Sequence, residues 1–132
     1  MRTLEVKSAQ RSEMIDITDR VAAALSEEAL REGEVTVFVP HTTAGVTINE
    51  AADPAVAADI MKGLDSLVPW EAGWRHAEGN AAAHVKATLV GSSVRVVVEG
   101  GRLVLGTWQG IFFCEFDGPR QRRVVVSFTP RG

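Results

Sequence analysis

The sequence has one cysteine, no basic excess and no long apolar run, and each scarcity excludes a class of protein. Cys114 has no partner for an intramolecular disulfide, which is typical of a reducing compartment. No apolar stretch in the 132 residues approaches the ~18 needed to span a bilayer, and "MRTLEVKSAQ" lacks the apolar centre of a signal peptide. We therefore expect a soluble cytoplasmic protein with no membrane partner.

Positive charge is too scarce for general nucleic-acid binding. The formal net charge is −3 and the pI is near 5.6, whereas a protein that binds duplex phosphates presents a basic face. The one dense basic cluster is Arg120, Arg122 and Arg123. We interpret it first as a solvated strand end and only second as an anion site. No nucleic-acid partner is expected.

Several common catalytic signatures are also absent. The chain contains no GxxxxGK[ST], HExxH, CxxC or GxSxG motif, which argues against the common ATPases, zincins and α/β-hydrolases. What is present is enough apolar material for one core, since 45% of the residues are hydrophobic. No linker, repeat or low-complexity tract interrupts the chain, so we expect a single domain over residues 1–132.

Strand and helix patterns alternate along this domain. One helix is expected to begin at a Thr18 or Asp19 cap and to stop by Gly33; a second begins at Asp53-Pro54 and ends before Pro69; a third covers 81–89, between an Asn80 cap and Gly91. Strands are expected at 2–7, 13–17, 35–39, 45–49, 94–98, 102–105, 107–116 and 122–128. Strands outnumber helices and several neighbours look antiparallel, which favours an α+β fold.

The three histidines are the first candidates for chemistry. His41 follows a predicted strand in "VPHTTAG", His76 lies in a loop, and His84 shares a helix face with Asn80 and Thr88. Imidazoles bind metals and move protons near pH 7, so three of them can form a metal or acid/base site if the fold joins them. The alternative is unrelated surface or core histidines, and spacing alone does not decide between the two.

Carboxylates supply the second set of candidates. Glu50 and Asp53 stand at a strand-to-helix junction, where Asp53 is explained as a helix cap. Glu115 lies in a strand with apolar residues on both faces, so it needs a partner. That partner is either an arginine or a ligand in a pocket. Cys114 is interpreted as a core residue rather than a nucleophile. The tryptophans either stack an aromatic ligand or simply fill space; they are Trp70, Trp74 and Trp108.

Three stretches together resemble the YjbQ-like family, whose members are described as secondary thiamine-phosphate synthases. They are "HTTAGVTINEAADP", "HAEGNAAAHVKATLVGSS" and "GGRLVLGTWQGIFFCEFDGPRQRRVVV". The resemblance covers about residues 2–129. It implies an α+β sandwich of mostly antiparallel strands with about three helices, assembled as a homotrimer. It also implies a polar pocket near a subunit interface.

The resemblance assigns roles to residues of this pocket. The histidines His41, His76 and His84 are implied as catalytic groups and as ligands of a divalent metal, Zn or Mg, and Glu115 as a further catalytic group. Substrate contacts are implied for the other polar motif residues: Thr42, Thr43, Glu50, Glu78, Asn80, Trp108, Gln109 and Arg120. The implied transferase reaction joins hydroxymethylpyrimidine diphosphate to a thiazole phosphate and releases diphosphate.

Two other functions stay open for this small-molecule pocket. A metal-dependent hydrolase of a phosphorylated metabolite would use the same histidines, with Glu78 or Glu115 as the base. A non-catalytic metabolite-binding trimer would show ligand-induced stabilisation without turnover.

Overall fold

Eight strands and three helices make up the chain, which a computed structural model describes over residues 1–132. The strands are β1 (Arg2–Lys7), β2 (Glu13–Asp16), β3 (Gly33–Phe38), β4 (Ala44–Glu50), β5 (Ser93–Glu99), β6 (Arg102–Leu103), β7 (Gln109–Glu115) and β8 (Gln121–Pro130). The helices are α1 (Thr18–Glu28), α2 (Pro54–Leu67) and α3 (Ala81–Val90). No helix is both long and apolar enough to cross a membrane.

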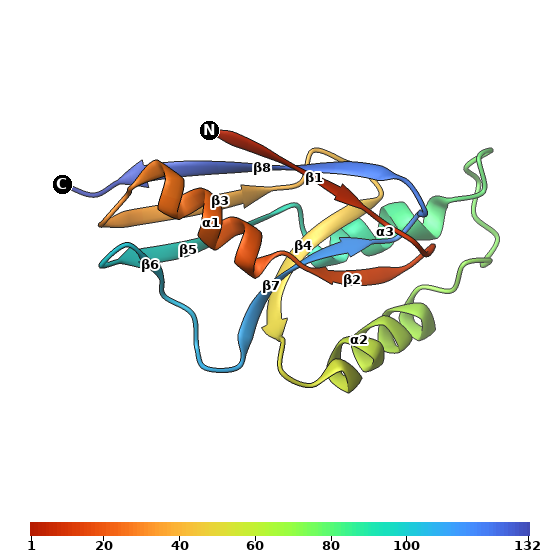
Figure 1. The fold of residues 1–132 in the computed structure, drawn as a ribbon. Helices are drawn as coiled ribbons and strands as arrows, with labels where there is room; N and C mark the ends of the chain where they lie inside the picture. Colours follow the sequence, from red (N-terminus) through yellow and green to blue (C-terminus); the bar gives the residue numbers. More distant parts are fainter.

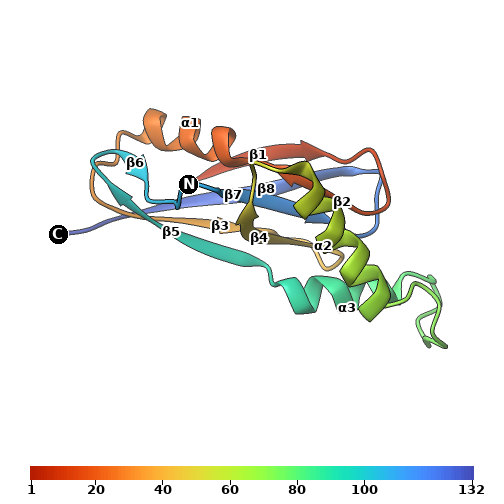
Figure 2. The ribbon, with the colours of Figure 1, turned by 90° about the horizontal axis from the view of Figure 1, so that it is seen from below.

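The strands form two sheets in which every pairing is antiparallel (Figure 1). The larger sheet has the order β1-β8-β3-β5-β6, and the smaller has β2-β7-β4. Helix α1 lies along the half of the molecule that carries the β5–β6 hairpin, while α2 and α3 lie at the other end (Figures 1 and 2). The expected α+β class, with mostly antiparallel strands and three helices, is confirmed.

The main core lies between the larger sheet on one side and the smaller sheet with α1 on the other. Alternate residues of β3 and β8 enter it, as the period-2 pattern of a strand requires; examples are Val35, Val37, Val124 and Val126. The helix contributes Val21, Leu25 and the preceding Ile17, and the smaller sheet contributes Val46, Ile111 and Phe113.

A second, smaller core covers the opposite face of the smaller sheet. Phe112 and Cys114 point into it from β7, and Ala83 reaches it from α3. Partly buried Met61 and Leu64 close it from α2. Because the two cores flank β7, this strand is buried on both faces, which confirms the prediction made from its apolar pattern.

The helix ends agree only in part with expectation. The N-cap of α1 is Ile17, and the Asp16 carboxylate accepts from the backbone N–H of Thr18 at 2.9 Å, so the predicted Thr18 or Asp19 cap is wrong. This helix also ends earlier than Gly33, at Ala29 in the left-handed conformation. In α2, Asp53 caps the helix as predicted by accepting from the N–H of Ala55 at 2.9 Å.

Glycines allow the tight connections near the candidate site. A Cβ on Gly45 would lie 2.6 Å from the carbonyl oxygen of Gly91, which itself accepts from the N–H of Val46 at 3.1 Å. The glycine of the "TTAG" stretch therefore lets the end of α3 approach β4 closely. At the β5–β6 hairpin, Gly100 and Gly101 both have positive φ, as expected for this turn.

Candidate functional site

Two of the three histidines face one surface depression. His41, in the connection between β3 and β4, and His84, on α3, line a hollow of about 380 Å³. The rest of its wall carries hydroxyls and small groups and no carboxylate: Thr42, Ala44, Ala87, Thr88, Gly91 and Ser92. The fold thus brings together residues 43 positions apart in the sequence, by packing α3 on β4.

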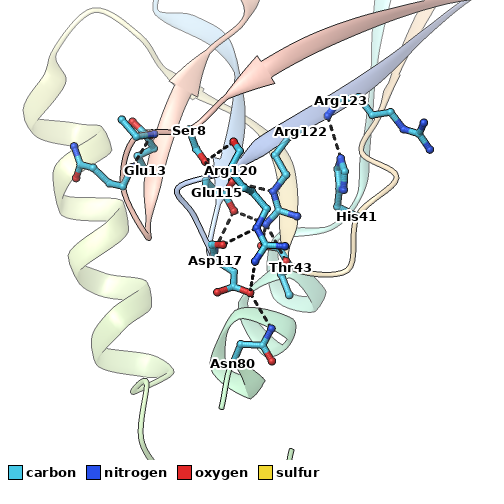
Figure 3. Close-up of polar contacts among 12 residues, drawn as sticks. Ser8, Glu13, His41, Thr43, Asn80, Glu115, Asp117, Arg120, Arg122 and Arg123 are labelled. Carbon is cyan, nitrogen blue, oxygen red and sulfur yellow. Dashed lines mark hydrogen bonds and ion pairs between the residues drawn. The ribbon is translucent and has the colours of Figure 1, made fainter. Parts of the chain in front are cut away.

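His41 is held in one orientation by strand β8. Its Nε2 accepts from the backbone N–H of Arg123 at 3.0 Å (Figure 3). Burial lowers the pKa of His41, and the nearby Arg122 guanidinium lowers it further. The ring is therefore neutral at pH 7, with its proton on Nδ1, because Nε2 acts as the acceptor. His41 consequently presents an N–H donor and has no free ring nitrogen for a metal.

His84 lies beside the third histidine. The rings of His76 and His84 meet edge to face with centroids 5.3 Å apart. The His76 Nε2 lies 3.9 Å from the Glu78 carboxylate; the His76 side chain is 43% exposed and that of Glu78 is 75% exposed. The structure therefore links all three histidines through His84, which borders the depression with His41 and packs against His76.

The histidines do not form a metal centre within one chain. No group of three or more His, Cys, Asp or Glu side chains is arranged to hold a metal ion. In addition, the Nε2 of His41 is engaged with Arg123. The donor set of a single chain does not fit the three or four protein ligands that a zinc site requires. A single chain therefore provides no complete ligand set for the metal expected at His41, His76 and His84.

Glu115 forms a buried ion pair with an arginine. Its carboxylate is fully buried and accepts from Arg122 Nε at 2.9 Å and from Arg122 Nη2 at 2.5 Å (Figure 3). It also accepts from the Ser8 hydroxyl at 2.7 Å and the Asp117 N–H at 3.0 Å. Burial alone would raise the pKa of Glu115, but these hydrogen bonds outweigh it and hold the pKa below its usual value.

This geometry decides how Glu115 can act. Both carboxylate oxygens are occupied and the group is sealed from solvent, so of the two partners expected for Glu115 the structure provides the arginine. The second nitrogen of that arginine reaches further: Arg122 Nη2 donates to the Thr43 hydroxyl at 2.9 Å. Glu115 therefore positions the "HTTAG" segment through Arg122 and does not contact a ligand.

Arg122 is the site residue that the sequence interpretation missed. The prediction of a solvated strand end for Arg120, Arg122 and Arg123 is wrong for Arg122, because its side chain is buried. The signal was in the strand period: Arg122 shares a face with Val124 and Val126, which are core residues. Arg123, on the opposite face, is exposed as expected.

A second polar group joins α3 to the turn before β8. Asn80 is the N-cap residue of α3, as predicted, but its side chain makes no capping hydrogen bond; its amide donates to Asp117 Oδ2 at 2.8 Å. Arg120 donates to the same oxygen at 3.1 Å and keeps half of its side chain exposed. The Asn80 side-chain oxygen is buried and has no hydrogen-bond partner. This contact fixes the start of α3, from which His84 projects one turn later.

The remaining candidates lie at the far end of the smaller sheet. In the β4–β7 pairing, Ala44 faces Glu115 at one end and Glu50 faces Gln109 at the other. The two ends are six residue steps apart along the strand, roughly 20 Å. Trp108 is beside Gln109 and its side chain is mostly exposed. The single chain therefore does not bring Glu50, Trp108 and Gln109 to the histidines.

Comparison with known proteins places the chain among close relatives. The family model "UPF0047 protein YjbQ-like" matches residues 2–131. UPF0047 protein YugU of Bacillus subtilis is 55% identical over 128 residues, covering 96% of this chain and 97% of that protein. UPF0047 protein MJ1081 of Methanocaldococcus jannaschii is 48% identical over 123 residues, covering 93% and 89%. These names state a family and no reaction.

Solved structures share the same fold over almost the full length. A crystal structure of a YjbQ/UPF0047 family protein from Clostridium acetobutylicum superposes with a TM-score of 0.96 at 48% identity, covering 98% of this chain and all of that chain. The hypothetical protein APE1520 of Aeropyrum pernix superposes with a TM-score of 0.94 at 39% identity, covering 98% of each. The sequence match and the shared fold agree, and the chain belongs to the YjbQ-like UPF0047 family.

Proposed function

We propose that the His41–His84 depression binds the diphosphate of a small-molecule substrate and that the protein is a thiamine-phosphate synthase-like transferase. The observation that carries the proposal is the wall of the depression, which offers two imidazoles and the hydroxyls of Thr42 and Ser92 and contains no carboxylate. The third hydroxyl, that of Thr88, donates to the backbone carbonyl of His84. Arg123 beside His41 adds positive charge, whereas the charge of Arg122 is compensated by Glu115. Such a wall favours a phosphorylated anion over a cation. The choice of reaction comes from the family resemblance of the motifs.

In this reaction a thiazole ring nitrogen attacks the methylene carbon of hydroxymethylpyrimidine diphosphate. A C–N bond forms, the C–O bond breaks, and diphosphate leaves with the electron pair. The protein has to stabilise the negative charge that grows on the leaving oxygens. His41 Nδ1–H, His84 and the Thr42 hydroxyl are the donors assigned to that task. Mg²⁺ enters as the counter-ion of the diphosphate substrate, since the chain itself lacks a complete metal site.

Glu115 supports this site by positioning. Its ion pair with Arg122 fixes Thr43, two residues after His41, so that His41 and Thr42 face the depression. A general base needs a carboxylate oxygen that can reach substrate, and Glu115 has none. A hydrolase with Glu115 as base is therefore the weaker proposal.

We also propose that a second copy of the chain supplies the aromatic wall of the pocket. A pyrimidine ring needs a stacking surface, and Trp108 offers an exposed one. Trp108 lies far from the histidines of its own chain. In the homotrimer that the resemblance implies, its exposed ring can contact the histidines of a neighbouring copy. Inactive His84→Ala and Trp108→Ala chains, mixed after reversible dissociation, would then regain part of the activity. Mixing that restores none would reject this arrangement.

The transferase proposal is tested with the purified protein, both phosphorylated precursors and Mg²⁺, with thiamine phosphate detected by mass spectrometry. The protein should come from a strain that lacks its main thiamine-phosphate synthase. Product is expected with the wild type and with Arg95→Gln, an exposed control on β5, and not with His84→Ala. Product no higher than in a mock preparation would refute the transferase. Release of phosphate without the thiazole partner would instead support a hydrolase.

A further inference from the structure

Helix α3 presents a second functional group on its other side. Lys86 follows His84 by two residues, about 200° around the helix, so it points away from the histidine depression. It lines a separate hollow of about 390 Å³ between the β1–β2 turn, the end of α2 and the start of the following loop. The other residues of this hollow are Gln10, Arg11, Ser12, Asp65 and Trp70.

Lys86 is a buried cation with few partners. Its side chain is only 2% exposed, and it is one of the largest fully buried side chains in the protein. An ammonium removed from water requires compensating hydrogen bonds. Its only partner is the carboxylate of Asp65, whose own side chain is 59% exposed. Asp65 belongs to α2, a helix with no fully buried residue. Two of the three ammonium donors of Lys86 therefore have no protein acceptor.

A second cation lines the same hollow. The Arg11 guanidinium lies over the Trp70 ring, 4.2 Å from its centroid, and forms no ion pair with any carboxylate. Stacking holds the planar group in place while its N–H donors stay available. The hollow thus contains two cations and one carboxylate, together with the Ser12 hydroxyl and the Gln10 amide.

We infer that this hollow is a binding site for a small oxyanion, the phosphate or carboxylate group of a metabolite. The anion would accept from the Lys86 ammonium and from the Arg11 guanidinium, with the Ser12 hydroxyl as a further donor. The anion would either bind Lys86 together with Asp65 or replace Asp65 as the partner of the Lys86 ammonium. The site is distinct from the His41–His84 depression and does not depend on the proposed transferase.

Inorganic phosphate is the probe, and the tryptophan indole N–H resonances of the ¹⁵N-labelled full chain are the readout. We expect the Trp70 signal and the Arg11 Nε–H signal to shift saturably. The Nε–H signal of Arg102, an exposed arginine on β6, should stay unchanged and serve as an internal reference. Arg11→Gln should weaken binding about tenfold, the loss of one charge-assisted hydrogen bond. Lys86→Met should remove binding.

Matched variants distinguish phosphate binding at the Lys86–Arg11 hollow from binding at the His41–His84 depression. Arg102→Gln, an exposed arginine on β6, and His84→Ala should both keep the wild-type affinity at Trp70. Because Arg11 is exposed, Arg11→Gln remains informative even where Lys86→Met reduces folding. A shift that does not saturate, equals that produced by chloride at the same ionic strength, or persists unchanged in Arg11→Gln would overturn the assignment.

Discussion

Arg122→Met is the perturbation that best tests how the site is held in place. It leaves Glu115 as a fully buried carboxylate without its cation and removes the hydrogen bond to Thr43. Breaking a buried pair from one side costs about 3–5 kcal/mol, because an uncompensated charge stays behind. We expect the free energy of unfolding at pH 7, from urea titration followed by circular dichroism, to fall by about that amount.

Two further variants identify the cause of this loss. Adding Glu115→Gln to Arg122→Met removes the stranded charge but keeps an acceptor for Ser8 and the Asp117 N–H, so it should recover about 2 kcal/mol. Arg123→Met, one residue along and exposed, should change stability by no more than about 0.5 kcal/mol. A cost of Arg122→Met below about 1 kcal/mol, or no recovery on adding Glu115→Gln, would show that the buried ion pair does not hold this site in place.

The pH dependence has a definite sign. The folded-state pKa of Glu115 lies below its unfolded value of about 4.5, so the stabilisation by its partners is fully present above pH 4.5 and is lost as the pH falls through the folded pKa. In Arg122→Met the stranded carboxyl is protonated more readily because burial raises its pKa, so the difference in stability between wild type and this variant should shrink as the pH falls toward 4.5 and continue to shrink below it. A difference that grows with acidity would contradict the ion pair as its source.

Three other predictions concern neighbouring residues. His41 should titrate below pH 6.5 by NMR, because burial and then Arg122 lower its pKa; a value above 6.5 would show that the ring is not held as described. Gly45→Ala should destabilise the protein by about 1–3 kcal/mol in urea titration, since its Cβ would lie 2.6 Å from the Gly91 oxygen; an unchanged midpoint would rule out that close approach. Cys114, buried and with its pKa raised to about 12 by burial, should react with a thiol reagent only after unfolding, so rapid labelling of the native protein would contradict its burial.

Strand positions were predictable because they depend on local pattern. The alternation in β3 and the two apolar faces of β7 predicted which strands face one core and which lie between two. The cap at Asp53 was predictable for the same reason, because it uses a residue two positions away. The α1 cap was not, since Asp16 lies outside the usual cap position and is equally compatible with a strand end.

The candidate site was predictable only in part because its geometry depends on pairing between distant segments. The histidines His41 and His84 share a wall through the packing of α3 on β4, which no spacing in the sequence encodes. The β4–β7 register places Glu50 and Gln109 far from His41 and His84, although these residues all lie in the three stretches that resemble the family. The position of Arg122 on the core-facing side of β8 indicates that it is buried, whereas its charge alone suggests that it is exposed to solvent.

A titration of the protein with diphosphate shows whether His41 and His84 form one diphosphate site. The ring-proton resonances of the three histidines are followed by NMR at constant ionic strength. We expect the His41 and His84 signals to shift together along one saturable curve, and Thr42→Ala to weaken the affinity that this curve gives. Independent curves for the two histidines, or no shift of either, would contradict a shared diphosphate site.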